Sequence, residues 1–289
     1  MAISAAMVKE LRERTGLGMM DCKRALTEAD GDMEKAIEEL RKKSALKAAK
    51  KAGRTTANGL LGIHVAADGT RGAIVEVNIE TDFAAKNEKF IAFVSKVTEK
   101  LFESADGDLA ALAAGDLNAE RETLVQEIGE NITIRRGEVV ASAAGGISEY
   151  MHGDQRRGAL VNLAEANAEL GRDIAMHVVA INPMVVRSED VAPDVLAKER
   201  EIFTSQAAES GKPEDIVVKM VEGRVKKFLA EVSLLDQPFV KDGDIKVGKL
   251  VANAGTEVLS FVRYEVGEGI EVEETDFAAE VAAQVAGND

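Results

Sequence analysis

The feature that most constrains the fold is a pattern of two strands joined by a tight turn and followed by an amphipathic helix. Residues 61–65 alternate in polarity, Asp68-Gly69 is typical of a hairpin turn, and residues 72–79 are a second apolar strand. The helix that follows has apolar residues at helical spacing: Phe90, Phe93, Val94 and Val97. A hairpin with an apolar face needs a cover, and this helix supplies one.

The same order of patterns occurs a second time. Residues 147–151 and 159–163 are predicted strands joined by a turn at His152-Gly153-Asp154, and residues 173–180 are an apolar helix. A later stretch, residues 258–264, is a further strand that we expect to join this second unit. The sequence therefore predicts an α+β, multidomain chain with a duplicated hairpin-plus-helix unit, duplicated in pattern and not in letters.

Helices are predicted before and after these units. Three short helices end near residue 42, with Gly16 and Asp30-Gly31-Asp32 as the breaks between them. Residues 188–232 are an antiparallel helical hairpin, and residues 277–285 are an alanine-rich final helix. The second arm of the hairpin is expected to bury one apolar stripe, made of Ile216, Met220, Val225, Phe228 and Leu229.

Charge is unevenly distributed along the chain. The 289 residues have a formal net charge of −15, yet residues 41–54 contain seven basic side chains and no acidic one. A net charge of this sign disfavours binding of the whole molecule to nucleic acid or to anionic membranes. The basic segment is interpreted either as a solvated linker helix or as a contact for an acidic surface.

Signals for secretion or membrane insertion are not found in the sequence. Residues 1–7 are followed at once by Lys9 and Glu10, which leaves no apolar core for a signal peptide, and no run of about 18 apolar residues occurs. Cys22 is the only cysteine, which favours a reducing compartment. We therefore expect a cytoplasmic protein.

The residue types that usually carry catalysis or bind metals form no recognisable motif. The three histidines are far apart in sequence, and none has a second ligand at metal spacing. His177 is interpreted as a core residue and Cys22 as a partly buried thiol. Gly16-Leu17-Gly18 joins two helices and lacks the Gly-Lys-Ser/Thr of a phosphate loop. The sequence predicts no cofactor, no metal and no covalent chemistry.

Two motifs resemble the signatures of the bacterial elongation factor Ts family. Residues 11–26 are similar to the family's N-terminal signature, and residues 76–86, with Thr81-Asp82-Phe83 at their centre, are similar to its second signature. Ala84 departs from the Val usual in the family, and Ile79 stands where a smaller or polar residue is common. Further similar segments extend the resemblance along the whole chain: residues 147–153, 211–213, 220–224 and 237–240.

The resemblance implies a division of the chain into five parts. In order, these are a three-helix ubiquitin-associated-type domain with a basic linker, two core subdomains, a coiled-coil insertion and a C-terminal module. The corresponding residues are 1–54; 55–140; 141–187 with 233–265; 188–232; and 266–289.

The resemblance also implies a function and a set of contact residues. Family members bind the GTPase elongation factor Tu, GDP-bound and nucleotide-free, and accelerate GDP release; a homodimer or a two-plus-two assembly is also expected. Phe83 is the wedge that enters near the Mg²⁺ site of the partner, and Asp82 disturbs the groups around that ion. The other implied contacts are Thr81, Met19, Met20, His152, Gly153 and Phe277.

Each implied contact has a structural alternative. Thr81-Asp82 is also suited to cap the next helix while Phe83 packs in the core, and Met19-Met20 to fill the small N-terminal core. Residues 274–279 repeat residues 80–85 letter for letter, so the letters alone do not separate a wedge from a cap. For the whole chain, the alternative function is a ribosome- or RNA-associated protein that acts through residues 41–54.

Overall fold

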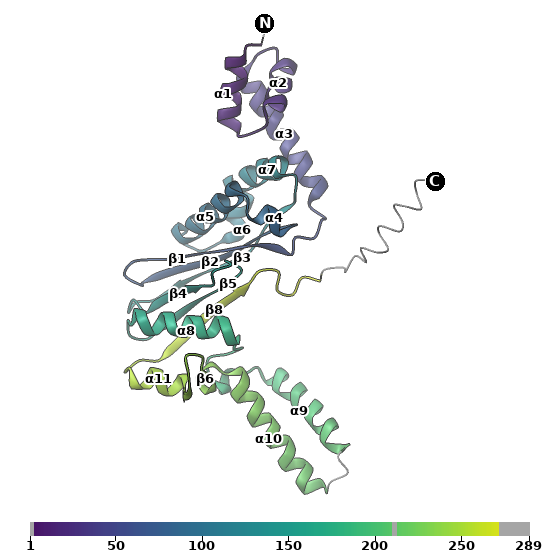
Figure 1. Cartoon of the computed structure of the whole chain (residues 1–289). Coiled ribbons are helices and arrows are strands. Elements are labelled where there is room, and N and C mark those ends of the chain that lie inside the picture. The colour runs from purple at the N-terminus through teal and green to yellow at the C-terminus, as the bar shows by residue number, and fades with distance from the viewer. Residues whose placement is uncertain (1–2, 210–212, 272–289) are drawn as a thin grey trace.

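The computed structural model describes residues 3–209 and 213–271. It is an elongated stack: a helical bundle at one end, two sheets with their helices in the middle, and a helical hairpin at the other end (Figure 1). The chain is thus a mixed α/β, multidomain protein, as predicted. Among the described residues, none of the helices combines the length and apolarity needed to cross a membrane.

The N-terminal bundle consists of α1 (Ala5–Thr15), α2 (Met19–Glu28) and α3 (Met33–Lys51). Its first break is at Gly16, whose φ of 72° suits a residue without Cβ. The bundle has a small core of its own, with these fully or largely buried residues: Val8, Leu11, Leu17, Cys22, Ala25, Leu26, Ala36 and Leu40.

Helix α3 is longer than predicted, because it ends at Lys51 and not near Lys42. The basic segment therefore continues the helix that begins at Met33. Its letters are mostly Ala, Lys and Leu, which favour helix, and tertiary contacts secure it. Ser44 and Ala48 are buried, and the Ser44 hydroxyl donates to Gln126 Oε1 on α7 at 2.7 Å.

The first sheet has the order β1-β2-β3, all antiparallel, with bounds Asn58–Val65, Arg71–Ile79 and Ile132–Ala141. Helices α4 (Asp82–Ala85), α5 (Glu88–Glu103), α6 (Leu109–Ala114) and α7 (Asp116–Ile128) lie between β2 and β3 in the chain. Helices α5 and α7 pack on one face of the sheet, and Phe90, Phe93 and Val125 are among the residues buried there.

The second sheet has the order β4-β5-β8, with bounds Ile147–Met151, Arg157–Leu163 and Val258–Glu265. The prediction that the last strand joins this unit is confirmed, because β8 pairs with β5. Helix α8 (Ala168–Ile181) covers the outer face, and α11 (Val247–Asn253) contributes Val247 and Val251 to the same core. Strands β6 (Pro238–Phe239) and β7 (Asp242–Lys246) form a short separate hairpin.

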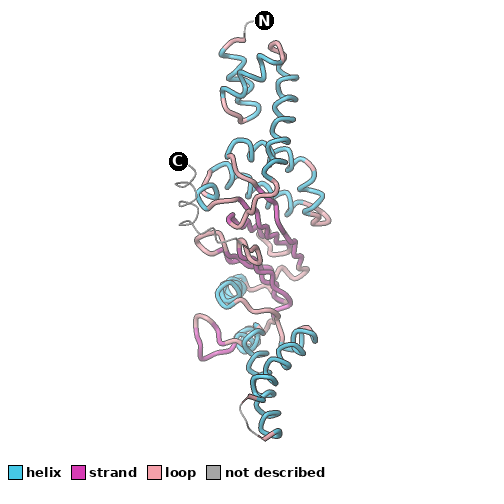
Figure 2. Tube along the Cα trace, turned by 90° about the vertical axis from the view of Figure 1, so that its right-hand side faces the viewer, coloured by secondary structure: helices cyan, strands magenta, loops and turns pink. Residues whose placement is uncertain are grey.

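The two sheets pack face to face, so that the middle of the molecule has four layers: helices, sheet, sheet, helices (Figures 1 and 2). Alternation along β2 turns Val75 and Val77 towards α5 and Ile74 towards the second sheet. Leu61, Ile74, Ile147 and Leu160 form an apolar layer between the sheets.

The helical hairpin predicted over residues 188–232 contains α9 (Pro193–Ala208) and α10 (Glu214–Val232). The predicted stripe is wrong at Ile216, which is 41% exposed, but it is confirmed at Val225, which is buried. Met220 and Leu229 pack against the same core, and Val221, which was not predicted, is buried there as well. Phe203 and Phe228 meet edge to face with ring centroids 6.4 Å apart. Two short 3-10 turns, Ser188–Asp190 and Leu234–Asp236, connect the hairpin to the second unit.

Candidate partner-binding site

Thr81 begins the turn that carries Asp82 and Phe83. Strand β2 ends at Ile79, and the Thr81 hydroxyl accepts a hydrogen bond from the Ala84 amide at 3.2 Å, as an N-cap does. The Thr81 amide and hydroxyl both donate to the Glu130 carboxylate, at 2.9 and 2.8 Å. Because the short helix α4 is held at its start by two independent elements, the side chains that follow project from a fixed support.

Phe83 lies on the surface and not in the core. Its side chain is 80% exposed, which makes it the most exposed large apolar residue in the described part of the chain. Lys86 lies above the ring, with Nζ 5.4 Å from its centroid, and also pairs with Asp82 at 3.1 Å. The alternative in which Phe83 packs internally is therefore wrong, whereas the cap by Thr81 is present. Full burial of a Phe side chain yields about 1.5–3 kcal/mol, which the isolated chain forgoes.

Met19 and Met20 are also exposed, at 55% and 76%. They occupy the first turn of α2 after Gly18, which has no side chain to cap the helix. The alternative that these two methionines fill the bundle core is wrong, because the core is filled by other residues, Leu11 and Leu26 among them.

The end of α7 brings the Met19-Met20 turn and the Phe83 turn into one region. Lys89 forms an ion pair with Glu127 in the last turn of α7, and its Nζ lies 3.5 Å from the carbonyl oxygen of Gly16, just before α2. Three residues further on, Glu130 holds Thr81. Glu127 and Glu130 were not predicted from the sequence. No local pattern indicates a contact such as that between Thr81 and Glu130, which are 49 positions apart.

The turn at His152-Gly153 joins β4 and β5, as predicted. His152 Nδ1 lies 3.0 Å from Asp154 Oδ1, and Arg157 also binds Asp154. Burial would raise the Asp154 pKa, but hydrogen bonds from the Arg156 amide, His152 and Arg157 outweigh it and hold that pKa at about 2. A Cβ on Gly153 would meet no atom within 4 Å, so the fold itself does not require glycine there. The remaining predicted contact, Phe277, lies outside the described residues, as does the helix expected over residues 277–285.

The predicted core role of His177 is confirmed. It is fully buried, with Nε2 at 2.9 Å from Gln237 Oε1 and Nδ1 accepting from the Val240 amide at 3.1 Å; burial lowers its pKa. Cys22 is buried too, with Sγ 3.7 Å from the Leu17 carbonyl oxygen. Among the described residues no group of three or more His, Cys, Asp or Glu is arranged to hold a metal ion.

The basic segment uses much of its charge inside the molecule. Lys43 binds Glu28 in α2, Lys51 donates to the Gly129 carbonyl oxygen at the end of α7, and Arg54 pairs with Glu80 at 3.4 Å. Lys42 pairs with Glu38 at 2.9 Å on its own helix. The Lys51 bond anchors α3 to the core, and the pairs of Lys42, Lys43 and Arg54 with acidic residues offset part of the charge that a polyanion would bind, which weakens the RNA alternative.

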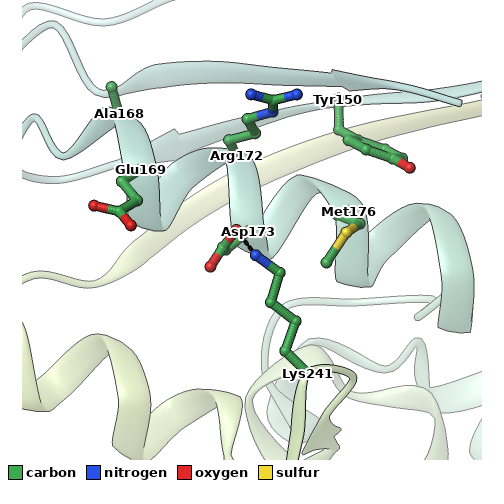
Figure 3. A pocket seen from close by; sticks show the side chains of 7 residues that line it. All are labelled: Tyr150, Ala168, Glu169, Arg172, Asp173, Met176 and Lys241. Carbon is green, nitrogen blue, oxygen red and sulfur yellow. Dashed lines mark hydrogen bonds and ion pairs between the residues drawn. The ribbon is translucent and has the colours of Figure 1, made fainter.

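An open cavity of about 540 Å³ lies on the outer face of α8, away from Phe83 (Figure 3). Lys241, from the β6–β7 turn, reaches across it to Asp173 at 2.5 Å. Its lining mixes charges of both signs with apolar surface and does not single out a ligand: Tyr150, Ala168, Glu169, Arg172, Asp173, Met176 and Lys241.

Comparison with known proteins identifies the family. Residues 80–268 match the family model described as Elongation factor TS. The chain is 58% identical over 286 residues to the Elongation factor Ts of Hahella chejuensis, covering 99% of each chain. It is 56% identical to that of Saccharophagus degradans, covering 99% of each, and 54% identical to that of Teredinibacter turnerae, covering 99% of this chain and 98% of the relative. The chain therefore belongs to the elongation factor Ts family.

Proposed function

We propose that this chain releases GDP from elongation factor Tu by inserting Phe83 near the Mg²⁺ site of the GTPase, while Asp82 disturbs the groups around the ion. Membership of the family makes the chain a guanine-nucleotide exchange factor for elongation factor Tu. The observation that carries the mechanism is the exposure of Phe83 on a turn that Thr81 and Glu130 hold rigid.

The required energy shows that one side chain is not enough. A thousandfold faster release needs about 4 kcal/mol off the dissociation barrier. Burial of Phe83 in the partner supplies about 1.5–3 kcal/mol of that. The rest comes from a wider interface, for which the exposed Met19-Met20 turn, the His152-Gly153 turn and residue Phe277 are the proposed contacts.

The chemistry at the partner explains why a wedge is effective. In a GTPase of this kind, backbone amides, a lysine and a Mg²⁺ ion hold the diphosphate, so displacing the Mg²⁺ ligands weakens the nucleotide. Linkage makes the effect reciprocal: GDP weakens the binding of the exchange factor by the same factor. The chain forms and breaks no covalent bond in this process, and it binds both the GDP-bound and the nucleotide-free partner.

The separate hydrophobic cores support the proposed division of the chain. The ubiquitin-associated-type domain with its linker is residues 1–54, core subdomain N is 55–140, core subdomain C is 141–187 with 233–265, the coiled coil is 188–232 and the C-terminal module is 266–289. Distinct clusters of buried residues lie in the first four of these parts. A fifth cluster joins the two core subdomains through their sheets.

The coiled coil has exposed apolar residues on both of its helices. Ile202, Ile216 and Val218 on the coiled coil are 39%, 41% and 56% exposed, which supports a contact with a second copy in a homodimer or a two-plus-two complex. The lone, buried Cys22 suits the reducing cytoplasm, where translation takes place.

The test is stopped-flow release of a fluorescent GDP from elongation factor Tu. We expect the wild-type chain to accelerate release and Phe83→Ala to lose most of the acceleration without a change in its unfolding midpoint. Leu259→Ala on β8 is the matched control, because Leu259 is also an exposed apolar residue, at 47%, and it should behave as wild type. Equal rates for Phe83→Ala and wild type would exclude the wedge.

A further inference from the structure

A buried carboxylate lies between the two sheets. Glu76 on β2 has no exposed surface, and its oxygens receive hydrogen bonds from Arg135 Nη1 at 2.9 Å and Arg136 Nε at 2.6 Å, both on β3. Asn78 Nδ2 donates to Oε1 at 3.0 Å, and the Gly267 amide does so at 2.8 Å. A buried charge is tolerated only when it is paired and hydrogen-bonded in this way. The four donors therefore fix the position of the Glu76 carboxylate.

The same cluster fixes the point at which the chain leaves the second sheet. Besides binding Glu76, Arg136 donates from Nη2 to the Glu265 carbonyl oxygen at 3.0 Å and stacks over Tyr264, with 4.3 Å between the guanidinium carbon and the ring centroid. Arg135 donates to the Glu268 carbonyl oxygen. The segment after β8 is thereby tied to the first sheet.

A line of amides continues from Glu76 to the two predicted contact turns. Asn78 Nδ2 also donates to the carbonyl oxygen of Asn58, the first residue of β1, at 3.2 Å. Asn58 Nδ2 donates to the carbonyl oxygen of Glu80, directly before Thr81, at 3.0 Å. Asn58 Oδ1 accepts from Arg156 Nη1, in the turn that begins at His152, also at 3.0 Å. One half-buried side chain thus holds both turns.

We propose that Asn58 is a positioning residue for nucleotide exchange, which sets the Phe83 turn and the His152-Gly153 turn at the spacing that the partner requires. The inference rests on the proposed function of those two turns. Asn78, which is buried and bonded to Glu76, holds the Asn58 backbone, and Glu76 also holds the segment near residue 267. Asn58 is itself no contact residue.

The role has a kinetic signature that a purely structural role lacks. Loss of Asn58 removes no contact side chain, so the chain still associates with its partner. Simultaneous engagement of both turns becomes less frequent, and a misplacement near 1 Å at a reacting site costs up to about 100-fold in rate. The maximal release rate should therefore fall. The concentration of exchange factor that gives half of the maximal rate should stay the same.

The experiment measures GDP release against exchange-factor concentration for wild type, Asn58→Ala and Arg156→Gln, with thermal unfolding of each. We expect about a tenfold lower maximal rate for Asn58→Ala with half-saturation within about twofold. Arg156→Gln, which breaks only the link to the His152 turn, should show a smaller fall of the same kind. Asn118→Ala is the matched control, because Asn118 is a half-buried asparagine that also donates and accepts, to Glu122 and from Arg121.

The outcomes separate this role from the proposed function. Wild-type maximal rates in a folded Asn58→Ala, or a raised half-saturation alone, would overturn the positioning role while the loss in Phe83→Ala upholds the wedge. No acceleration by wild type would overturn both. If Asn58→Ala does not fold, Arg156→Gln decides: an unchanged maximal rate contradicts the role, and a lowered one supports it.

Discussion

At the scale of single residues, Thr81 both caps α4 and joins it to the end of α7. Its hydroxyl caps α4 through the Ala84 amide, and its amide and hydroxyl bind Glu130. The cap starts α4 in an orientation in which Phe83 is exposed and Ala85 is buried. The cap and the proposed wedge, which the sequence presents as alternatives, are therefore compatible, because the cap supports the turn that carries Phe83.

Thr81→Ala should therefore affect both stability and exchange. The loss of the cap costs about 1–2 kcal/mol in the free energy of unfolding, measured by urea denaturation, and the release rate falls because α4 is less well fixed. Thr123→Ala is the control, since the Thr123 hydroxyl binds only the Ala119 carbonyl oxygen within α7. An unchanged stability of Thr81→Ala would contradict the support role.

At the scale of elements, the two hairpin-plus-helix units could be predicted from the sequence, whereas helices α6 and α7 and strand β3 were missed. Both hairpins, their helices and the pairing of the last strand follow from alternation and helical spacing. Strand β3 was not predicted, because Arg135 and Arg136 interrupt its apolar pattern. Those arginines bind Glu76, about 60 residues earlier, and the segment after β8, both of which the fold brings beside them.

The candidate site shows the same division. The Thr81-Asp82-Phe83 turn could be predicted from its motif, and its place at the end of a strand from the pattern before it. Its anchors, Glu130 and Asn58, could not, because they come from other parts of the chain with no motif of their own.

The α9–α10 hairpin should behave as an element that unfolds independently. Among the residues of the hairpin that the structure describes, its core cluster has three buried members, Ala207, Val221 and Val225. Val225→Ala removes two methylene equivalents and should cost about 2 kcal/mol locally. Hydrogen exchange should accelerate in α9 and α10 and stay unchanged in the sheets. Faster exchange throughout the molecule would show that the hairpin is not a separate unit.

At the scale of the whole molecule, the two sheets form one central body. Leu160 on β5 and Ile74 on β2 are buried in the layer between them, and Glu76 binds both the first sheet and the segment after β8. The Phe83 turn belongs to the first unit and the His152 turn to the second. The shared layer is therefore what holds these two proposed contact turns rigidly relative to each other.

Leu160→Ala should destabilise both units together. The substitution leaves a cavity in the shared layer and should cost about 2–5 kcal/mol. Calorimetry, combined with a local probe in each sheet, should show that both sheets of the variant unfold in one joint transition at a lower temperature. Separate transitions, with only the second sheet destabilised, would contradict a common central body.

The central claim, that Phe83 is what weakens GDP, is tested most directly by a coupling measurement. The affinity of the chain for elongation factor Tu is measured without nucleotide and with saturating GDP, for wild type and Phe83→Ala. We expect wild type to bind the nucleotide-free partner about 100-fold more tightly, and Phe83→Ala to reduce that ratio to a few-fold. A Phe83→Ala chain that loses affinity equally in both states, with its ratio unchanged, would show that Phe83 only adds binding energy.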